Sequence, residues 1–250
     1  MKKNLFKTAF MATFALMGAV LMSCGGSSSN SGKTLPTDGP FGEIPQLCSD
    51  YQDIQDKYTS GALNLEKDAM KKLTEAYDEY AEAFKAKAET MQGVEIKTEF
   101  AGDYPFKITK PFTITPFPGS KKFYSTGSFG SPADFSFVAE GETTEAMEMG
   151  YGIDFAVIAY DTDGNIIKCS STTISPTERK FGKREAGTSF YITHLFVFNP
   201  WYLDKAAKLD KFVLIDRENE LVQQCEESYI EARKGWQARQ DSLRQQKQNK

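Results

Sequence analysis

The sequence predicts an α+β protein, in which an antiparallel β-sandwich is preceded by a long amphipathic helix and followed by a C-terminal helix. Between Leu65 and Met91 the apolar residues recur at alternating spacings of three and four, which is the helical period. Residues 94–225 change to a period of two, with frequent glycine, proline, β-branched and aromatic residues. Residues 226–250 favour a helix, because Gly235 is the only glycine or proline among them.

Residues 1–23 have the pattern of a signal peptide. Three lysines near the start precede an uncharged apolar run of fourteen residues, Ala9–Met22. This run is too short to cross a bilayer as a helix, which needs about 20 residues. The run ends in Leu21-Met22-Ser23-Cys24, which resembles the lipobox of bacterial lipoproteins. The resemblance implies cleavage before Cys24 and lipidation of its thiol, and the two or more acyl chains would form a stable membrane anchor.

The residues after the cysteine predict where the anchored protein resides. Residues 24–46 are expected to be the lipid anchor and a flexible tether, since the first of them are rich in glycine and serine. Gly25 follows the cysteine, where lipoproteins retained in the inner membrane carry aspartate, so the resemblance implies the outer membrane. The tether lacks an acidic cluster, which favours the periplasmic face, with display on the cell surface as the alternative. Removing the three lysines of the leader would leave 27 basic and 34 acidic residues, a net charge of -7.

Residues 47–93 are predicted to be helical. Asn64 is a suitable N-cap and Gly93 a stop for the long helix, whose opposite face carries charged residues that we expect to be solvated. A shorter helix is expected before it, ending near Tyr58. The apolar stripe of the long helix is expected to pack against another part of the protein; its members are Ala69, Met70, Leu73, Tyr77, Tyr80, Phe84, Ala88 and Met91.

Residues 94–225 are predicted to form the β-sandwich from short strands joined by frequent turns. The Asp-Gly step within Asp161–Asn165 is a strong hairpin signal between two apolar runs. The same carboxylates suggest calcium, but a loop that starts at Asp161 lacks the glycine and glutamate that an EF-hand needs, so a plain turn is favoured. The expected strands are 94–100, 106–114, 121–126, 133–138, 152–160, 166–173, 188–198 and 212–216.

The segment from Tyr151 to Ile167 resembles the central hairpin of immunoglobulin-like sandwich domains found in many bacterial lipoproteins. In that hairpin a strand that ends in an aromatic residue and an aspartate enters an Asp-x-Asp-Gly-Asn turn. The resemblance covers at most residues 151–217. It implies an immunoglobulin-like architecture and supplies no catalytic residues.

The last β-strands are joined by a predicted short helix, with Asn199 as N-cap and Pro200 in its first turn. The C-terminal helix, within residues 226–250, has only a thin apolar stripe that includes Tyr229 and Trp236. This stripe either pairs with the long N-terminal helix or stays free to recruit a partner, and the sequence does not decide between the two.

The scarcity of metal ligands and catalytic bases argues against an enzyme. The 250 residues carry a net charge of -4, with 40% hydrophobic and 26% charged residues, and the chain shows no basic stripe for nucleic acid. His194 is the only histidine, and its neighbours place it on an apolar strand face, where a hydrogen-bonded core residue is the expected role. We therefore expect no catalytic residues, no metal and no cofactor.

Three cysteines remain once Cys24 is lipidated, so at least one is free or pairs between chains. Cys48 precedes the first helix and Cys225 follows the last strand. If the terminal helices are neighbours, a Cys48–Cys225 disulfide is the favoured pairing in an oxidising compartment. Cys169, on a strand, would then be a small buried apolar residue.

The aromatic residues give the candidate binding site. Ten of them lie between Phe100 and Phe137, and most are expected in the core. Tyr124, Phe129 and Trp201 are the candidates for an exposed contact. The predicted function is a lipid-anchored envelope protein that binds proteins or acts as a scaffold without catalysis. Its expected partners are the membrane, through Cys24, and envelope proteins; the alternative is a lipoprotein that binds a glycan or solute through exposed aromatic rings.

Overall fold

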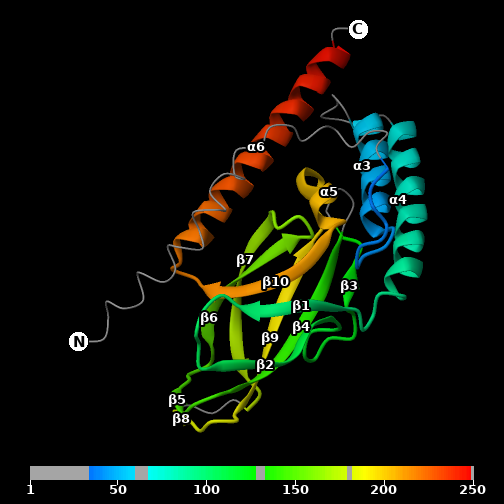
Figure 1. Ribbon diagram of the computed structural model, residues 1–250. Helices are drawn as coiled ribbons and strands as arrows, with labels where there is room; N and C mark the ends of the chain where they lie inside the picture. Colours follow the sequence, from blue (N-terminus) through cyan, green and yellow to red (C-terminus); the bar gives the residue numbers. More distant parts are fainter. Residues whose placement is uncertain (1–33, 60–66, 128–132, 179–181, 249–250) are drawn as a thin grey trace.

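The computed structural model describes residues 34–59, 67–127, 133–178 and 182–248. A β-barrel lies at the centre of the molecule, two helices pack beside one of its ends, and a long C-terminal helix crosses its outer wall (Figure 1). Several predicted features lie outside the described residues: the leader, the lipidation residue Cys24, the first part of the tether up to residue 33, the N-cap candidate Asn64 and the candidate contact Phe129.

Seven strands of the described part form a closed ring in the order β2-β1-β10-β6-β7-β9-β4, which is closed by pairing between β2 and β4. Their bounds are β1 (Glu95–Phe100), β2 (Phe106–Ile114), β4 (Asp134–Thr143), β6 (Ile153–Asp161), β7 (Ile166–Pro176), β9 (Ser189–Val197) and β10 (Leu209–Asp216). The short β3 (Tyr124–Ser125) pairs with the start of β4. Strands β5 (Met147–Glu148) and β8 (Lys183–Arg184) form a small separate sheet at one end.

The prediction of an antiparallel immunoglobulin-like sandwich is wrong, because these strands close into one mixed barrel. A sandwich consists of two sheets whose edge strands remain unpaired. Here the two strands at the ends of the order, β2 and β4, pair with each other and close the sheet into a barrel. Strands β1 and β10 pair in parallel, from Lys97↔Lys211 to Phe100↔Leu214, and the other pairs are antiparallel. The Asp161–Asn165 turn does join the hairpin β6–β7, but that hairpin is a part of the barrel wall.

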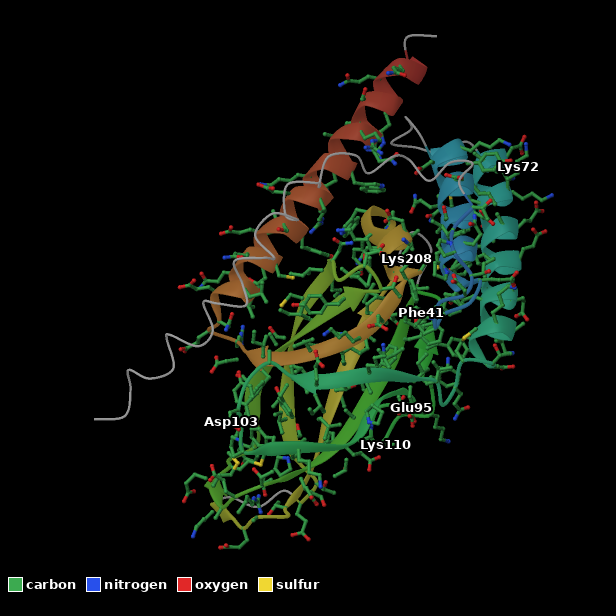
Figure 2. The ribbon with its side chains drawn as sticks, viewed as in Figure 1. Phe41, Lys72, Glu95, Asp103, Lys110 and Lys208 are labelled. Carbon is green, nitrogen blue, oxygen red and sulfur yellow. The ribbon has the colours of Figure 1, made fainter. Side chains whose placement is uncertain are left out.

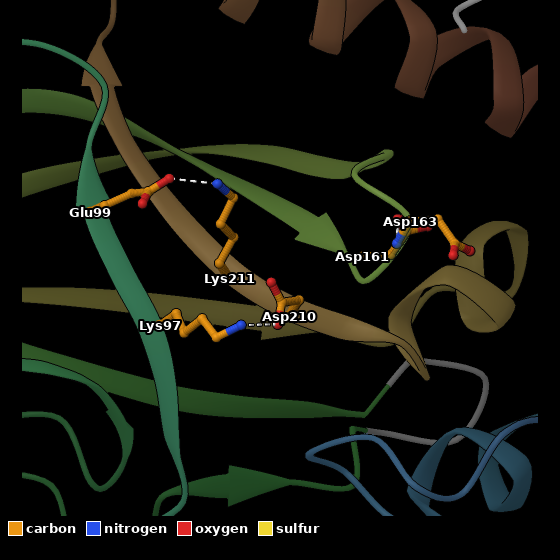
Figure 3. Close-up of polar contacts among 6 residues, drawn as sticks. All are labelled: Lys97, Glu99, Asp161, Asp163, Asp210 and Lys211. Atoms are coloured by element: carbon orange, nitrogen blue, oxygen red, sulfur yellow. Dashed lines mark hydrogen bonds and ion pairs between the residues drawn. The ribbon is translucent and has the colours of Figure 1, made fainter. Parts of the chain in front are cut away.

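Ion pairs reinforce the parallel seam of the barrel on its outer face. Lys97 Nζ lies 2.7 Å from Asp210 Oδ1, and Lys211 Nζ lies 2.6 Å from Glu99 Oε1 (Figure 3). Opposite charges on neighbouring strands add a small stabilisation and favour this register over its alternatives.

The interior of the barrel is filled by large apolar side chains, many of them phenylalanine. On β9 the buried residues alternate, as Phe190, Ile192, His194 and Phe196, which is the period of a strand with one face inward. Rings from neighbouring strands meet edge to face, with centroids 5.2 Å apart for Phe137 and Phe212. The centre of this barrel is therefore a packed core.

Residues 34–46 belong to the fold, although composition assigns them to the tether. Leu35, Phe41 and Ile44 are almost completely buried, and Phe41 contacts four phenylalanines of the barrel. Figure 2 shows Phe41 between the barrel and the helices beside it. This segment closes one end of the barrel.

Helices α3 (Ile44–Thr59) and α4 (Lys67–Ala88) pack against each other beside that closed end. The stripe of α4 buries Leu73, Tyr80, Phe84 and Ala88, while its other faces carry charged residues. Tyr80 stacks on Tyr51 of α3 with ring centroids 4.3 Å apart. From Leu73 onward the long amphipathic stripe is thus covered by α3 and the barrel, whereas Met70 near its start is 41% exposed.

The C-terminal helix α6 (Glu220–Gln248) starts on the outside of β7 and continues past the end of the barrel (Figure 1). It is 29 residues long, which corresponds to about 43 Å. Its partners are β7 and the short helix η2 (Pro200–Tyr202), and a hydrogen bond of 3.2 Å from Gln240 to Asp56 links it to α3. The sequence left two arrangements open, pairing with the long N-terminal helix or remaining free. The structure shows neither: α6 is not paired with α4, and its first half packs on the barrel.

Candidate functional site

The candidate site lies where α6 leaves the barrel and crosses η2. Pro200 occupies the first turn of η2, where its fixed φ angle suits a helix start and its missing N–H costs nothing. Tyr202 points inward, is 3% exposed and donates a hydrogen bond to the carbonyl of Val197. Asn199 donates to the Tyr202 hydroxyl at 2.9 Å. This buried anchor fixes η2 and positions the adjacent Trp201 against α6.

Two aromatic residues of α6 meet Trp201. Tyr229 and Trp236 are seven residues apart, which places them two turns apart on one face of the helix. Each ring centroid lies 5.7 Å from that of Trp201, and the Arg233 guanidinium lies 6.0 Å from the Trp201 ring. We call these four residues the Trp201 cluster. All three rings are half-buried, so the cluster both attaches α6 and presents aromatic surface to solvent.

The aromatic residues predicted as one contact surface do not form one in the described part of the chain. Tyr124 is half-buried beneath α4, where its ring centroid lies 5.8 Å from that of Phe84 and 6.4 Å from that of Phe135. Trp201 lies beneath α6 instead, and Phe129 is outside the described residues. Of the three candidates, Trp201 alone is placed in a cluster with other half-exposed rings.

The charges on α6 are separated along its length. Its first twelve residues carry only acidic charges, from Glu220, Glu226, Glu227 and Glu231. Its second half contains Arg233, Lys234, Arg239, Arg244 and Lys247 in its sequence, against the single acid Asp241. This distribution complements the helix dipole, which favours acids at the start and bases at the end. It also gives an acidic chain an exposed basic segment, the outer half of α6.

His194 is enclosed in the barrel core. Its side chain is 3% exposed, and its ring centroid lies 4.9 Å from that of Phe212 and 5.9 Å from that of Phe112. Burial, together with the nearby charge of Lys168, lowers the pKa of His194 to about 3. Its Nε2 atom has no hydrogen-bond partner among the described residues, which differs from the hydrogen-bonded role expected. A neutral imidazole in this position is a core residue with no access to substrate.

The aspartates of the β6–β7 turn serve the turn itself. Asp161 is 4% exposed and accepts hydrogen bonds from the backbone N–H groups of Asp163 and Asn165, at 3.0 and 2.8 Å. Its second carboxylate oxygen accepts the Asn165 side chain at 3.1 Å, and Gly164 adopts the positive φ of 79° at the tip. Among the described residues no group of three or more acids, cysteines or histidines is arranged to hold a metal.

A shallow hollow of about 370 Å³ lies between this turn and the residues that enter the barrel end. Leu35 and Asp204 are among its lining residues, and Lys208 crosses to Asp163 with 3.0 Å between Nζ and Oδ2. Asp161, Asp163 and Lys208 of the hollow thus already have partners within the protein, which leaves these groups less available to a ligand.

The predicted pairing of Cys48 with Cys225 is not found, since all three described cysteines are free thiols with other neighbours. Cys48 belongs to α3 and does not precede it, and its sulfur is 3.6 Å from the Tyr80 hydroxyl oxygen of α4. Burial raises the pKa of the Cys48 thiol to about 12. Cys225 is hydrogen-bonded to Cys169, because α6 packs on β7 and not on α3 at that point.

Comparisons of the chain with protein-family models, with curated proteins and with solved structures give no match. The site is thus defined by its own geometry. Trp236 and Tyr229 are the residues that sequence reasoning left out of the site. Their seven-residue spacing was the available signal, but it did not identify Trp201 as their common neighbour.

Proposed function

We propose that the chain is a lipid-anchored protein of the bacterial outer membrane that binds an envelope protein from the periplasmic side and carries out no catalysis. The anchor proposal rests on the order of the basic start, the apolar run and the lipobox-like Leu21–Cys24. Among the described residues no helix is long and apolar enough to cross a membrane.

The anchor is tested with Cys24→Ala in cells grown with radioactive palmitate. The unchanged protein is expected to be labelled and to fractionate with the outer membrane. The variant is expected to lose the label and to leave the membrane fraction, because it lacks the thiol that carries the acyl chains. If the variant is still labelled by palmitate and still fractionates with the outer membrane, the proposal is contradicted. Cys48→Ala, which changes another cysteine, serves as the matched control.

The observation that carries the binding proposal is the outer half of α6, which is exposed and basic and extends past the barrel (Figure 1). The barrel core is filled by side chains, which leaves the surface as the place for a partner. Basic side chains on a fixed helix favour a partner with an acidic surface, because complementary charges speed association and select the partner. The Trp201 cluster supplies aromatic surface beside these charges.

This proposal is tested by photo-crosslinking in cells. A photoreactive phenylalanine analogue replaces Gln237, which is exposed on α6, and in the matched control it replaces Leu195, which is 41% exposed on the barrel wall. We expect a discrete adduct from position 237 that is reduced when Lys234 and Arg239 are both changed to glutamate. Equal adducts from the two positions, or no effect of the charge reversal, contradict the proposal.

A second candidate function, binding of a glycan or solute, is favoured by the half-exposed rings of Trp201 and Trp236. Aromatic faces beside a guanidinium group are a common platform for ligands. The two residues are the only tryptophans of the chain, so tryptophan fluorescence reports on this cluster alone. Saturable changes with a panel of envelope oligosaccharides, lost in Trp236→Ala, would support this function; a flat response would contradict it.

A further inference from the structure

A small apolar cluster lies outside the barrel, where α6 begins. Ile158 of β6, Ile215 of β10 and Val222 of α6 are buried there, separately from the main core. Cys169 of β7 packs against this cluster and is half-buried. Cys225 follows Val222 by three residues, which places both on the face of α6 that meets the barrel.

The packing makes the two thiols neighbours. Cys169 packs on the cluster to which Val222 of α6 belongs, and Cys225, one turn after Val222, is only 2% exposed. A side-chain interaction between Cys225 and Cys169 agrees with this placement. The contact joins a helix and a strand that pack on each other, so it is set by the tertiary structure. Two cysteines that face one another from a packed helix and strand can be joined when their sulfurs approach to about 2 Å.

The surroundings make the two thiols chemically different. The hydrogen bond from Cys225, helped by the charge of Lys168, lowers the pKa of Cys169 against the opposing effects of burial and Glu226. The same hydrogen bond and burial raise the pKa of Cys225. Cys169 is also the more accessible of the two. It is therefore the thiol that reacts first with an external disulfide, because the thiolate is the attacking species.

We propose that Cys169 and Cys225 form a disulfide that fastens α6 to strand β7. The oxidant is a disulfide, either a small molecule or an oxidoreductase in its disulfide form. The Cys169 thiolate attacks one sulfur of the oxidant, forms a mixed disulfide and releases the first thiolate. Cys225 then loses its proton, attacks the Cys169 sulfur and releases the second. The protein loses two protons and two electrons, which reduce the oxidant to two thiols.

This disulfide would hold the first turns of α6 against β7. It would thereby fix the end of the helix from which the exposed basic half extends. The pairing itself rests on the packing of α6 on β7, which makes the two cysteines neighbours. Its formation in the cell also rests on the export that the proposed function includes. The third thiol, Cys48, is 9% exposed and contacts Tyr80, so we expect it to stay reduced.

The test uses the full chain with Cys24→Ala, which removes the one thiol intended for lipid. The folded protein is oxidised with glutathione disulfide, its remaining thiols are alkylated, and its peptides are analysed by mass spectrometry. We expect a linked pair of peptides that contain Cys169 and Cys225, with Cys48 alkylated after denaturation. The melting temperature should rise by roughly 5–10 °C over the reduced protein, because the bridge restricts the unfolded chain.

Matched variants separate the pairing from general effects of oxidation. Cys48→Ala should keep both the linked peptides and the rise in melting temperature, and Cys225→Ala should lose both. Circular dichroism checks that each variant is folded, and Cys169→Ser provides a second variant should Cys225→Ala fail to fold. A link from Cys48 to either partner, or alkylation of both Cys169 and Cys225 in the oxidised folded protein, overturns the proposal.

The redox state in cells distinguishes this inference from the proposed function. Cells are quenched with acid, alkylated and analysed in the same way. A bridge in cells and in the purified protein supports both proposals. A bridge in the purified protein with reduced thiols in cells supports the pairing and contradicts the export.

Discussion

Phe41 stacks on Phe196 of β9 with ring centroids 5.3 Å apart and an angle of 21° between the ring planes. The same ring meets Phe198 edge to face at 4.7 Å, so a residue that precedes all described helices completes the aromatic core of the barrel. This relationship makes the segment before α3 part of the folding unit.

We predict that Phe41→Ala lowers the free energy of unfolding by about 3–5 kcal/mol, because it removes a fully buried ring and leaves a cavity at the barrel end. Urea denaturation monitored by circular dichroism measures the change. Met70→Ala, at a residue of α4 that is 41% exposed, is the control and should cost less than about 1 kcal/mol. Equal effects of the two changes would show that Phe41 does not close the core.

Phe41 also shows why the sequence predicted the strands better than the fold. Alternation along each segment indicates a strand with one buried face, and every strand of the barrel lies near an expected one. Closure depends on which strands pair, and the parallel pair Lys97↔Lys211 joins residues far apart in the chain. Local periodicity carries no information on such partners, and a lone phenylalanine in a glycine- and proline-containing segment does not reveal that it enters the core.

We predict that His194 makes the protein less stable at acidic pH. The unfolded chain binds a proton at this residue near pH 6.5, whereas the folded protein does so only near its pKa of about 3. The folded state is therefore fully favoured above pH 6.5 and loses stability as the pH falls toward 3. At pH 4 the loss from this residue is about 3 kcal/mol.

His194→Leu tests this prediction, because leucine has a similar volume and does not titrate. Unfolding free energies from urea denaturation at pH 7 and pH 4 are compared between the two proteins. The difference between the two pH values should be smaller in the variant by about 3 kcal/mol. Parallel losses in both proteins would mean that His194 is protonated in the folded state and that the core is open to water.

We predict that Asp161→Ala destabilises the β6–β7 hairpin by about 2 kcal/mol, because it removes a buried carboxylate that accepts three hydrogen bonds. Asp163→Ala is the matched control in the same turn. It loses only a surface ion pair with Lys208 and should change stability by less than about 1 kcal/mol. Thermal unfolding with and without calcium chloride adds a second measurement, and a calcium-dependent rise in the melting temperature would contradict the structural role of this turn.

The candidate site illustrates the same limit of sequence reasoning. Trp201 directly follows Pro200 in the segment that is predicted to be a short helix, and this local pattern does not show what its ring contacts. Its partners on α6 lie 28 and 35 residues later, and only the packing of α6 on η2 brings the rings together. The disposition of Tyr124 beneath α4 depends on the same kind of packing, since the short β3 pairs with only two residues of β4. Aromatic content is visible in the sequence, whereas convergence of aromatic residues is a property of the tertiary structure.

We predict that Trp236→Ala loosens the outer half of α6 and leaves the barrel intact. The change removes the ring that meets Trp201 at 5.7 Å, and beyond it only the Gln240–Asp56 hydrogen bond connects α6 to the body among the described contacts. An aromatic pair adds about 0.5–1.5 kcal/mol beyond its buried area, so opening of this part should become about 2- to 13-fold more frequent. Hydrogen exchange measured by mass spectrometry should then accelerate in peptides after Arg233 and stay unchanged in β9. Gln237→Ala, at an exposed neighbouring residue, is the control and should leave the exchange rates of both sets of peptides unchanged. Faster exchange in β9 with Trp236→Ala would instead mean that the cluster supports the whole barrel.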